Sequence, residues 1–270
     1  MTDLKTCLDR VREQAPLTLS ITNQVTINEC ANALLAIGAS PVMSGDPVDA
    51  EALGALAAGT VLNIGTINDR MLELALAAGR GARRAGRPVV LDPVGVGATE
   101  VRRRAAARII EEIRPDVIKG NFSEIIALAG LTDGGQKGVD SIAAGKIEAV
   151  AAALSLARSL GALVAVTGPS DVLTDGQATL LVTGGSILLT RITGAGCLLS
   201  ALVGAYAAAN PENRLSAVLA ALVHLALAGE RAEAGLVQAG ALGSFRVALF
   251  DQLALVSGQD LSDFKGVSRV

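Results

Sequence analysis

Residues 87–121 read RPVVLDPVGVGATEVRRRAAARIIEEIRPDVIKGN, and this stretch contains one complete strand–helix–strand unit. A short apolar run at residues 88–91 is followed by a basic, amphipathic helix over residues 99–114 and by a second short strand at residues 116–119. Strands that are apolar without alternation are typical of a parallel sheet covered by helices on both faces. This unit therefore predicts an α/β fold.

The same alternation extends along the chain at intervals of roughly 25–30 residues, as expected for strand–helix–strand units. Further strands are expected at residues 60–64, 163–167, 172–174, 178–182 and 186–189. Helices are expected at residues 1–15, 28–37, 69–85 and 146–160, and from Ser123 and Gly194 onward. An Asp-Gly turn makes residues 172–182 a hairpin. We expect one domain over residues 1–270, with a mainly parallel central sheet, an antiparallel edge and helices on both faces.

The composition indicates a folded, globular protein. Of the 270 residues, 51% are hydrophobic and 18% are charged, which provides ample apolar surface to bury and excludes a disordered chain. The net charge is −3, and one Tyr and no Trp leave little to stack on bases, so we expect no nucleic acid partner. The apolar stretches at residues 198–209 and 215–229 are shorter than the roughly 20 residues that span a bilayer, so we expect no membrane insertion.

The N-terminus and the cysteines favour a cytoplasmic location. The first residues, MTDLKTC, continue into charged residues without an apolar core, so no signal peptide is expected. Cys7, Cys30 and Cys197 are an odd number without CxxC spacing, which favours neither a disulfide framework nor a zinc site. The reducing cytoplasm is therefore the expected compartment.

Polar residues follow three of the expected parallel strands. Asp92 comes directly after the first, Lys119 to Glu124 follow the second, and Thr167 ends the third. Ligands in open α/β sheets bind at the carboxyl ends of strands, where Asp92 and Glu124 could reach a hydrated Mg²⁺. Each has a structural alternative, Asp92 as a turn-forming residue and Asn121 with Glu124 as a capping box. Their convergence on one sheet edge favours an active site.

A glycine-containing motif, TGAGCLLS at residues 193–200, opens a long helix. Gly194 and Gly196 let backbone N–H groups approach a ligand, and the positive end of the helix favours an anion. Cys197 falls in the first turn, where a thiolate is favoured. A glycine-rich turn with a buried cysteine explains the same residues equally well, because a GxG motif alone is weak.

Three further features have mainly structural interpretations. Met43 could form a soft wall for a small apolar ring, although a core Met is more common. His224 lies inside an apolar helix and is expected to be packed rather than catalytic. Three consecutive arginines at residues 102–104 are expected on a solvated helix face.

Six segments occur together in an order that resembles a known family. They are ITN (21–23), ANALLAIGASPVM (31–43), LNIGT (62–66), DPVGVGAT (92–99), KGNFSE (119–124) and GAGC (194–197). From about residue 16 to residue 253, the chain is similar to the hydroxyethylthiazole kinase family of thiamine salvage, within the ribokinase-like superfamily. No single segment is specific, but the combination is.

The resemblance implies a fold, a reaction and an assembly. The family has a ribokinase-like three-layer sandwich without a separate lid domain. It phosphorylates the primary alcohol of 4-methyl-5-(2-hydroxyethyl)thiazole with ATP and Mg²⁺. It is typically a trimer with active sites at subunit interfaces. We therefore expect a cytoplasmic homotrimer whose small-molecule substrates are the thiazole alcohol and ATP.

The resemblance also assigns roles to individual residues. The residues expected to contact the thiazole are Met43, Gly194 and Asn23. The residues expected to contact ATP are Lys119, Thr167, Ala195 and Gly196, the last two in a cradle for the transferred phosphate. The residues expected to organise Mg²⁺ and water are Asp92 and Glu124. Cys197 occupies the place where many ribokinase-like enzymes carry an Asp base.

Two positions depart from the family pattern. The pattern has Arg where this chain has Lys119, which supplies a point charge without a bidentate fork. It often has His where this chain has Leu19, on a loop expected near the thiazole pocket. The second change can alter substrate orientation or range. Neither change removes the phosphate cradle or the carboxylates.

Two other functions remain open. A ribokinase-like enzyme that repairs hydrated nicotinamide cofactors would carry Asp where Cys197 stands, and it would lack the segments at residues 22–23 and 39–41. A protein that binds the thiazole or a nucleotide without catalysis, after changes such as Leu19 and Lys119, fits the sequence as well.

Overall fold

A nine-stranded sheet runs through the centre of the protein, which a computed structural model describes for residues 3–133 and 142–269. The strands are β1 (Leu17–Ile21), β2 (Ser40–Val42), β3 (Gly59–Asn63), β4 (Val89–Asp92), β5 (Val117–Asn121), β6 (Leu163–Thr167), β7 (Ser170–Thr174), β8 (Thr179–Thr183) and β9 (Val267–Arg269). Their spatial order is β2-β1-β3-β4-β5-β6-β7-β8-β9. The first six in this order are parallel, and β7, β8 and β9 form the expected antiparallel edge.

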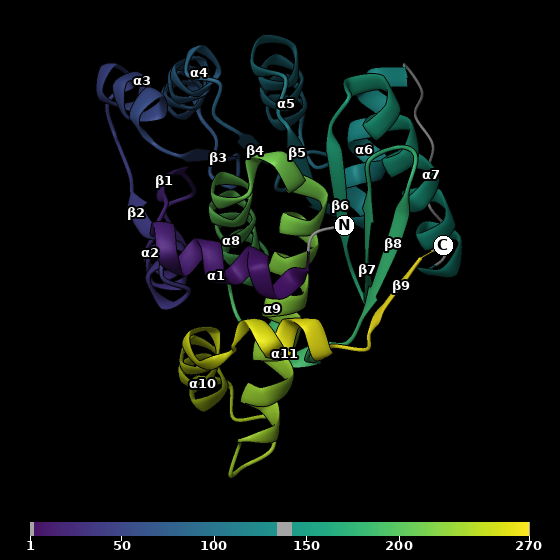
Figure 1. The fold of residues 1–270 in the computed structure, drawn as a ribbon. Helices are drawn as coiled ribbons and strands as arrows, with labels where there is room; N and C mark the ends of the chain where they lie inside the picture. The colour runs from purple at the N-terminus through teal and green to yellow at the C-terminus, as the bar shows by residue number, and fades with distance from the viewer. Residues whose placement is uncertain (1–2, 134–141, 270) are drawn as a thin grey trace.

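Helices cover both faces of the sheet (Figure 1). One face carries α3 (Pro47–Leu56), α4 (Asp69–Arg84), α5 (Glu100–Ile113), α6 (Phe122–Asp133) and α7 (Ile142–Leu160). The other face carries α1 (Leu4–Gln14), α2 (Ile27–Ala36), α8 (Ala195–Ala209), α9 (Arg214–Ala234), α10 (Leu242–Leu255) and α11 (Gly258–Asp263). These three layers confirm the predicted α/β sandwich.

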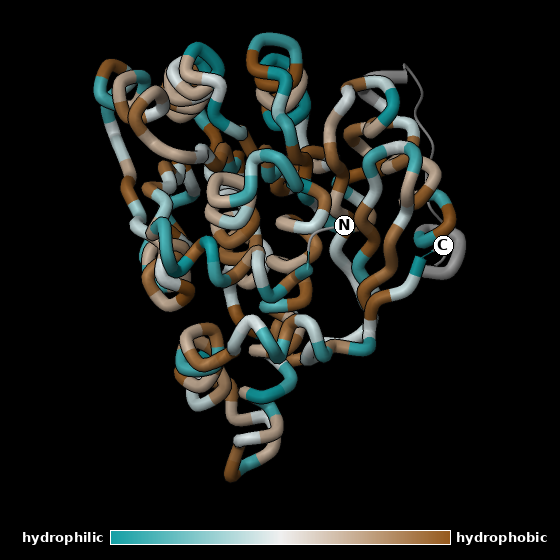
Figure 2. The backbone as a smooth tube through the Cα atoms, viewed as in Figure 1, coloured by the Kyte–Doolittle hydropathy of each residue, from teal (hydrophilic) through white to brown (hydrophobic). Residues whose placement is uncertain are grey.

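Each face of the sheet has its own apolar core, because successive side chains of a strand point to opposite sides. Val61 and Val90 belong to the core beneath α8 and α9. Leu62 and Leu91 belong to the core beneath α3 to α7. Figure 2 shows the hydrophobic residues along these central strands. Burial on both faces is the reason that the strands read as continuous apolar runs.

Small residues allow unusually close packing of the helices. A Cβ added to Gly54 in α3 would lie 2.2 Å from the carbonyl oxygen of Ala78 in α4. A Cβ added to Gly204 in α8 would lie 2.4 Å from Val61 Cγ2 in the sheet. The abundant Gly and Ala thus have a structural function, since a larger side chain at either glycine would push a helix away from its neighbour.

α9 with the turn before it, Pro211–Ala234, is a candidate membrane span by length and composition. This segment is longer than the apolar stretch at residues 215–229 that the sequence singles out. However, 78% of its most apolar window is buried inside the protein, and the core helix of a globular protein passes the same test. The burial fits the interpretation of this segment as a core helix packed through Ala and Gly.

The prediction of a strand at residues 186–189 is wrong. Residues 187–189 lie in a 3₁₀ helix, η1 (Ile187–Arg191), and Ser186 is its N-cap. Gly184 and Gly185, with φ angles of +133° and +94°, turn the chain out of the sheet after β8. β9, from the C-terminus, takes the edge position beside β8 instead. Four further elements, β1, β2, α3 and β9, are not predicted by the sequence pattern.

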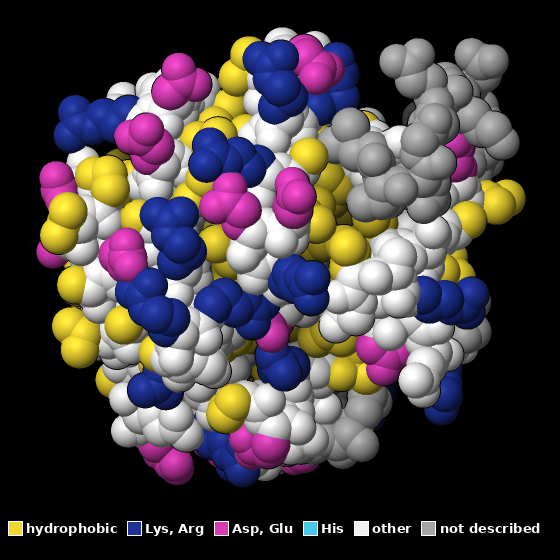
Figure 3. Space-filling view, turned by 90° about the horizontal axis from the view of Figure 1, so that it is seen from above, with side chains coloured by type: hydrophobic (Ala, Val, Ile, Leu, Met, Phe, Trp, Pro, Cys, Tyr) yellow, Lys and Arg dark blue, Asp and Glu magenta, His cyan; other side chains and the backbone are white. Residues whose placement is uncertain are grey.

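Acidic and basic side chains are interspersed on the outer face of the α3–α7 layer (Figure 3). One example is the exposed pair of Arg103 and Glu100 on α5, whose side chains lie 2.9 Å apart. Isolated surface pairs of this kind contribute little to stability. On the described part of this face, basic and acidic side chains therefore lie side by side (Figure 3).

A buried Tyr–His pair joins α8, α9 and α10. Tyr206 Oη lies 2.7 Å from His224 Nδ1, and His224 Nε2 lies 2.9 Å from the carbonyl oxygen of Leu253. A carbonyl oxygen can only accept, so Nε2 carries the proton and Nδ1 accepts from the Tyr206 hydroxyl. Burial lowers the pKa of His224 to about 4. His224 is therefore a neutral, packed residue, as expected.

We expect the free energy of unfolding to fall as the pH drops from about 6.5 to about 4, because the unfolded imidazole takes up a proton before the buried one does. A shift of this size corresponds to roughly 3 kcal/mol across that window. Urea unfolding of the wild type and of His224→Gln, at several pH values in this range, measures the effect. The variant should lose this part of the pH dependence; equal slopes in both proteins would contradict the assignment.

Candidate active site

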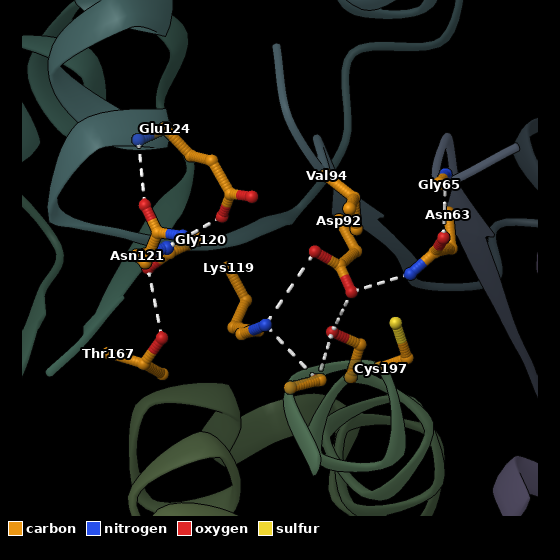
Figure 4. Close-up of polar contacts among 12 residues, drawn as sticks. Asn63, Gly65, Asp92, Val94, Lys119, Gly120, Asn121, Glu124, Thr167 and Cys197 are labelled. Atoms are coloured by element: carbon orange, nitrogen blue, oxygen red, sulfur yellow. Dashed lines mark hydrogen bonds and ion pairs between the residues drawn. The ribbon is translucent and has the colours of Figure 1, made fainter. Parts of the chain in front are cut away.

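Asp92 stands at the carboxyl end of β4 and is fully buried (Figure 4). Its Oδ2 accepts hydrogen bonds from Asn63 Nδ2 at 2.7 Å and from Ser200 Oγ at 2.8 Å. Its Oδ1 has no hydrogen-bond partner within the described part of the chain, and it lies 3.6 Å from Lys119 Nζ. The carboxylate is thus held by one oxygen and keeps the other available.

Lys119 connects β5 to the start of α8. Its Nζ donates to the carbonyl oxygen of Gly196 at 3.1 Å, and its side chain is only 4% exposed. Burial raises the pKa of Asp92, although the Lys119 ammonium opposes this rise. Burial also lowers the pKa of Lys119, but the carboxylates of Asp92 and Glu124 outweigh this and raise it overall. A charged ammonium therefore lies at the centre of the site.

Glu124 lies in the first turn of α6 and forms a capping box with Asn121. Asn121 Oδ1 accepts from Glu124 N at 2.9 Å, and Glu124 Oε2 accepts from Asn121 N at 2.8 Å. The structural alternative for this pair is therefore correct. The same carboxylate also reaches the loop after β4, where its Oε1 accepts from Gly95 N at 2.8 Å. Glu124 thus ties α6 to the loop that follows Asp92.

The N-terminus of α8 faces these groups and has no side-chain cap. Its N-cap residue, Gly194, has a φ of +86°, and a Cβ there would lie 2.3 Å from Thr26 Cγ2, so only glycine fits. The first N–H groups of a helix have no partner within the helix, which makes them available to an anion. Lys119 adds a positive charge at the same place. This geometry suits the expected phosphate cradle.

Asn23 links Cys197 to the carboxylate network. Its Oδ1 accepts from the backbone N–H groups of Val25 and Thr26, both at 3.1 Å. This orientation directs Nδ2 toward Asn63 Oδ1 at 3.1 Å and toward Cys197 Sγ at 3.2 Å. Both polar atoms of the Asn23 side chain are therefore engaged by the protein itself.

Thr167 and Met43 lie on opposite sides of the polar cluster that Asp92, Lys119 and Glu124 form. Thr167 ends β6 beside Asn121 of β5, and its Oγ1 donates to the carbonyl oxygen of Gly120 at 3.4 Å. Met43 follows β2 and is half-buried. β1 and β3 separate β2 from β4, which places Met43 about three strand spacings, or roughly 14 Å, from Asp92. Thr167 thus borders the cluster, whereas Met43 lies apart from it.

Asn63 and Ser200 belong to the site, although the sequence analysis assigns them no role. Asn63 lies opposite Asp92 in the sheet register, so the strand-end rule that identifies Asp92 also applies to it. Ser200 lies one helical turn after Gly196, and its Oγ, which donates to Asp92, also lies 3.2 Å from the carbonyl oxygen of Gly196. Its position on the cradle helix was the signal available in the sequence.

Two expectations about single positions are wrong. Arg102 is not on a solvated face, because its guanidinium donates to backbone carbonyl oxygens in the loops after β3 and β4. Leu19 is not in a loop near a pocket, because it lies inside β1 and is fully buried in the core on the α3–α7 side. α5 begins next to both loops, which brings Arg102 within reach of them.

The acidic groups of the site suit a magnesium ion that is bound together with phosphate. Mg²⁺ is usually held by one or two carboxylates, substrate phosphates and water. Asp92 Oδ1 is a buried oxygen without a hydrogen bond, and Glu124 supplies the second carboxylate. Within the described ranges, no group of three or more His, Cys, Asp or Glu residues could hold a metal ion. The donor set therefore fits a metal that arrives with a phosphorylated substrate.

The fold of the protein belongs to a structural class that it shares with pyridoxal kinases. The structure of pyridoxal kinase from Staphylococcus aureus in complex with ADP superposes with a TM-score of 0.60 at 19% identity, covering 80% of this chain and 88% of that one. This likeness defines the fold alone.

Sequence similarity identifies the family within this class. The model of the hydroxyethylthiazole kinase family matches residues 8–259. The hydroxyethylthiazole kinase of Cereibacter sphaeroides is 48% identical over 256 residues, which is 95% of each chain. The structure of the hydroxyethylthiazole kinase protein from Pyrococcus horikoshii OT3 has a TM-score of 0.89 at 39% identity and covers both chains fully. The chain therefore belongs to the hydroxyethylthiazole kinase family, which confirms the resemblance.

Proposed function

We propose that this protein transfers the γ-phosphoryl group of ATP to the primary alcohol of 4-methyl-5-(2-hydroxyethyl)thiazole, for thiamine biosynthesis or salvage. The observation that carries the proposal is the uncapped start of α8 facing Lys119 and the Asp92 oxygen that accepts no hydrogen bond. Unpaired N–H groups and an ammonium suit a polyphosphate. Membership of this family favours the thiazole alcohol as acceptor over a hydrated nicotinamide cofactor.

The residues of the chain act mainly by positioning and charge. The backbone N–H groups at Ala195 and Gly196 would hold the oxygens of the transferred group, where negative charge develops. Lys119, released from the carbonyl of Gly196, would contact the ATP phosphates, and Thr167 would contact ATP from the neighbouring strand end. Mg²⁺ held by Asp92 and Glu124 would supply charge that offsets the charge developing on the phosphoryl group.

The thiazole would bind at the opposite side of the cradle. Gly194 would lie against the ring, and Met43 would form the apolar wall. Asn23 would contact the substrate while keeping its hydrogen bond to Cys197. In this arrangement the hydroxyethyl arm would point toward the phosphate cradle.

An ADP-release assay with the thiazole alcohol, ATP and Mg²⁺ tests the proposed reaction. Release should require all three; a wild-type protein that binds ATP without thiazole-dependent release would be a binding protein instead.

Asp92→Ala and Glu124→Ala should each lower kcat by about 100-fold or more, because the charge on the transferred group loses its counter-charge. The KM for thiazole should change by only a few fold. Near-wild-type kcat in both variants at limiting Mg²⁺ would remove the metal assignment.

Cys197 is the candidate general base. Its Sγ lies in the first turn of α8, within 3.2 Å of Asn23 Nδ2 and beside the cradle. In phosphoryl transfer the hydroxyl proton can leave late, so a weak base is sufficient. We propose that Cys197, as a thiolate, accepts this proton and becomes a thiol while the new O–P bond forms and the bond from the γ-phosphorus to the departing ADP breaks, and that no phosphocysteine intermediate is made.

Substitutions of Cys197 test this role. Cys197→Ser should keep measurable activity but lower kcat by about 10- to 100-fold, because the positioning groups remain. Cys197→Asp should match or exceed the wild-type rate, since a carboxylate is ionised at neutral pH. A Cys197→Asp protein that folds, binds ATP and is inactive would refute the base assignment. Trapping of phosphate on Cys197 would establish covalent catalysis.

We propose a homotrimer whose subunits share active sites. The segment at residues 21–26 would complete the thiazole site of a neighbour. Val25 in this loop is 63% exposed, and Ile27 at the start of α2 is 38% exposed. The separation of Met43 from Asp92 also supports a pocket that is completed by a second copy.

Light scattering at the assay concentration measures the assembly. The expected mass is that of three chains, and Val25→Asp should lower it by placing a charge in the interface. A wild-type monomer with full activity would contradict the trimer.

For the same reaction we propose a cytoplasmic location, which the three free cysteines support and which cell fractionation would check.

A further inference from the structure

Arg102 joins the two loops that follow β3 and β4. Its Nη1 donates to the carbonyl oxygens of Ile64 at 2.9 Å and Val94 at 2.7 Å. Its Nη2 donates to the carbonyl oxygen of Gly65 at 2.6 Å. Ile64 and Gly65 belong to the loop after β3, and Val94 belongs to the loop after β4. One guanidinium therefore crosslinks two separate backbone segments.

The loop after β3 supports Asp92 through Asn63. Gly65 N donates to Asn63 Oδ1 at 2.9 Å, which orients the Asn63 amide so that its Nδ2 donates to Asp92 Oδ2. A Cβ on Gly65 would lie 2.9 Å from Asn63 Oδ1 and from Asn23 Nδ2. The position of Gly65 is thus tightly defined, and Arg102 holds its carbonyl oxygen.

The loop after β4 supports Glu124. Val94 N donates to the carbonyl oxygen of Asp92 at 2.9 Å, and the next N–H, that of Gly95, donates to Glu124 Oε1. Gly95 adopts a φ of +66°. Arg102 holds the Val94 carbonyl, which belongs to the same peptide unit as Gly95 N. The guanidinium thus fixes the direction in which this N–H points.

The place of Arg102 on α5 also favours a role outside its own helix. It is the third residue of α5, after the N-cap Thr99. A cation in the first turn opposes the helix dipole, so helix stability does not favour arginine there. Arginine is instead stabilised here by its hydrogen bonds to the three carbonyl oxygens. A planar guanidinium reaches all three together, and a lysine ammonium does not.

We propose that Arg102 is a positioning residue that sets the relative placement of Asp92 and Glu124. The inference rests on the proposed function, in which these two carboxylates hold the metal that accompanies ATP. Arg102 itself touches neither carboxylate. It acts through Gly65 and Asn63 on one side and through the Val94–Gly95 peptide on the other.

Three variants test the role of Arg102. Arg102→Lys keeps the charge, Arg102→Ala removes it, and Arg104→Ala is the matched control, since Arg104 is exposed two residues further along the same helix. Melting curves establish that each protein is folded. The readouts are kcat and KM for the thiazole alcohol, and the Mg²⁺ concentration at half-maximal ADP binding, measured by calorimetry.

We expect both Arg102 variants to lower kcat by about 100-fold, because small displacements of catalytic groups have effects of this size. The KM for thiazole should stay within a few fold of wild type. The Mg²⁺ concentration at half-maximal ADP binding should rise roughly 10- to 100-fold, as for other groups that orient metal ligands. Millimolar ethylguanidinium should restore part of the activity of Arg102→Ala, and Arg104→Ala should behave as wild type.

The outcomes separate this inference from the proposed function. An Mg²⁺ dependence of ADP binding in Arg102→Lys equal to that of Arg104→Ala would overturn the positioning role, even where the wild type phosphorylates the thiazole. A lowered melting temperature without any change in that dependence would also overturn it. A wild type that does not phosphorylate the thiazole would refute the proposed function, while the binding measurement still decides the role of Arg102.

Discussion

The buried carboxylate of Asp92 is the constraint on which the arrangement of the site depends. A charge without solvent exposure is costly unless hydrogen bonds and an opposite charge compensate for it. Here the compensation comes from three elements, with Asn63 at the end of β3, Lys119 on β5 and Ser200 on α8. All three elements must be in register before the charge is compensated. The same carboxylate therefore ties the sheet edge to the N-terminal part of α8.

Close packing is what allows α8 to take part in this network. Gly204 brings the helix against Val61 of the sheet, and Gly194 brings its first turn against Thr26. Larger side chains at these positions would displace the helix start from Lys119 and Asp92. The light, Gly- and Ala-rich composition is thus connected to function, because it sets the distance between a helix N-terminus and the strand ends.

The site combines structural and chemical use of the same groups. Glu124 completes a capping box and still directs a second oxygen to the neighbouring loop. Asp92 uses one oxygen to hold the network and keeps the other without a hydrogen bond. The Lys119 ammonium balances these carboxylates beside the positive end of α8.

Local pattern alone determined the four parallel strands β3 to β6 and the strand-end residues Asp92, Lys119 and Thr167. Continuous apolar runs such as residues 88–91 mark strands buried on both faces, and the polar residue after each run marks the sheet edge, because both signals are local. This rule does not predict β1, because its apolar residues alternate with Thr18 and Ser20. It wrongly predicts a strand at η1, because the short apolar run there resembles one.

The contacts between side chains were decided only by the tertiary structure. The sequence places Arg102 in a run of three arginines, and nothing in that run distinguishes it from its neighbours. Only the approach of α5 to the loops after β3 and β4 brings its guanidinium onto their carbonyl oxygens. In the same way, the pairing of β3 with β4 sets Asn63 opposite Asp92. Hydrophobic periodicity along the sequence indicates which residues are buried. The partner of a buried polar group, in contrast, depends on segments that are distant in the chain.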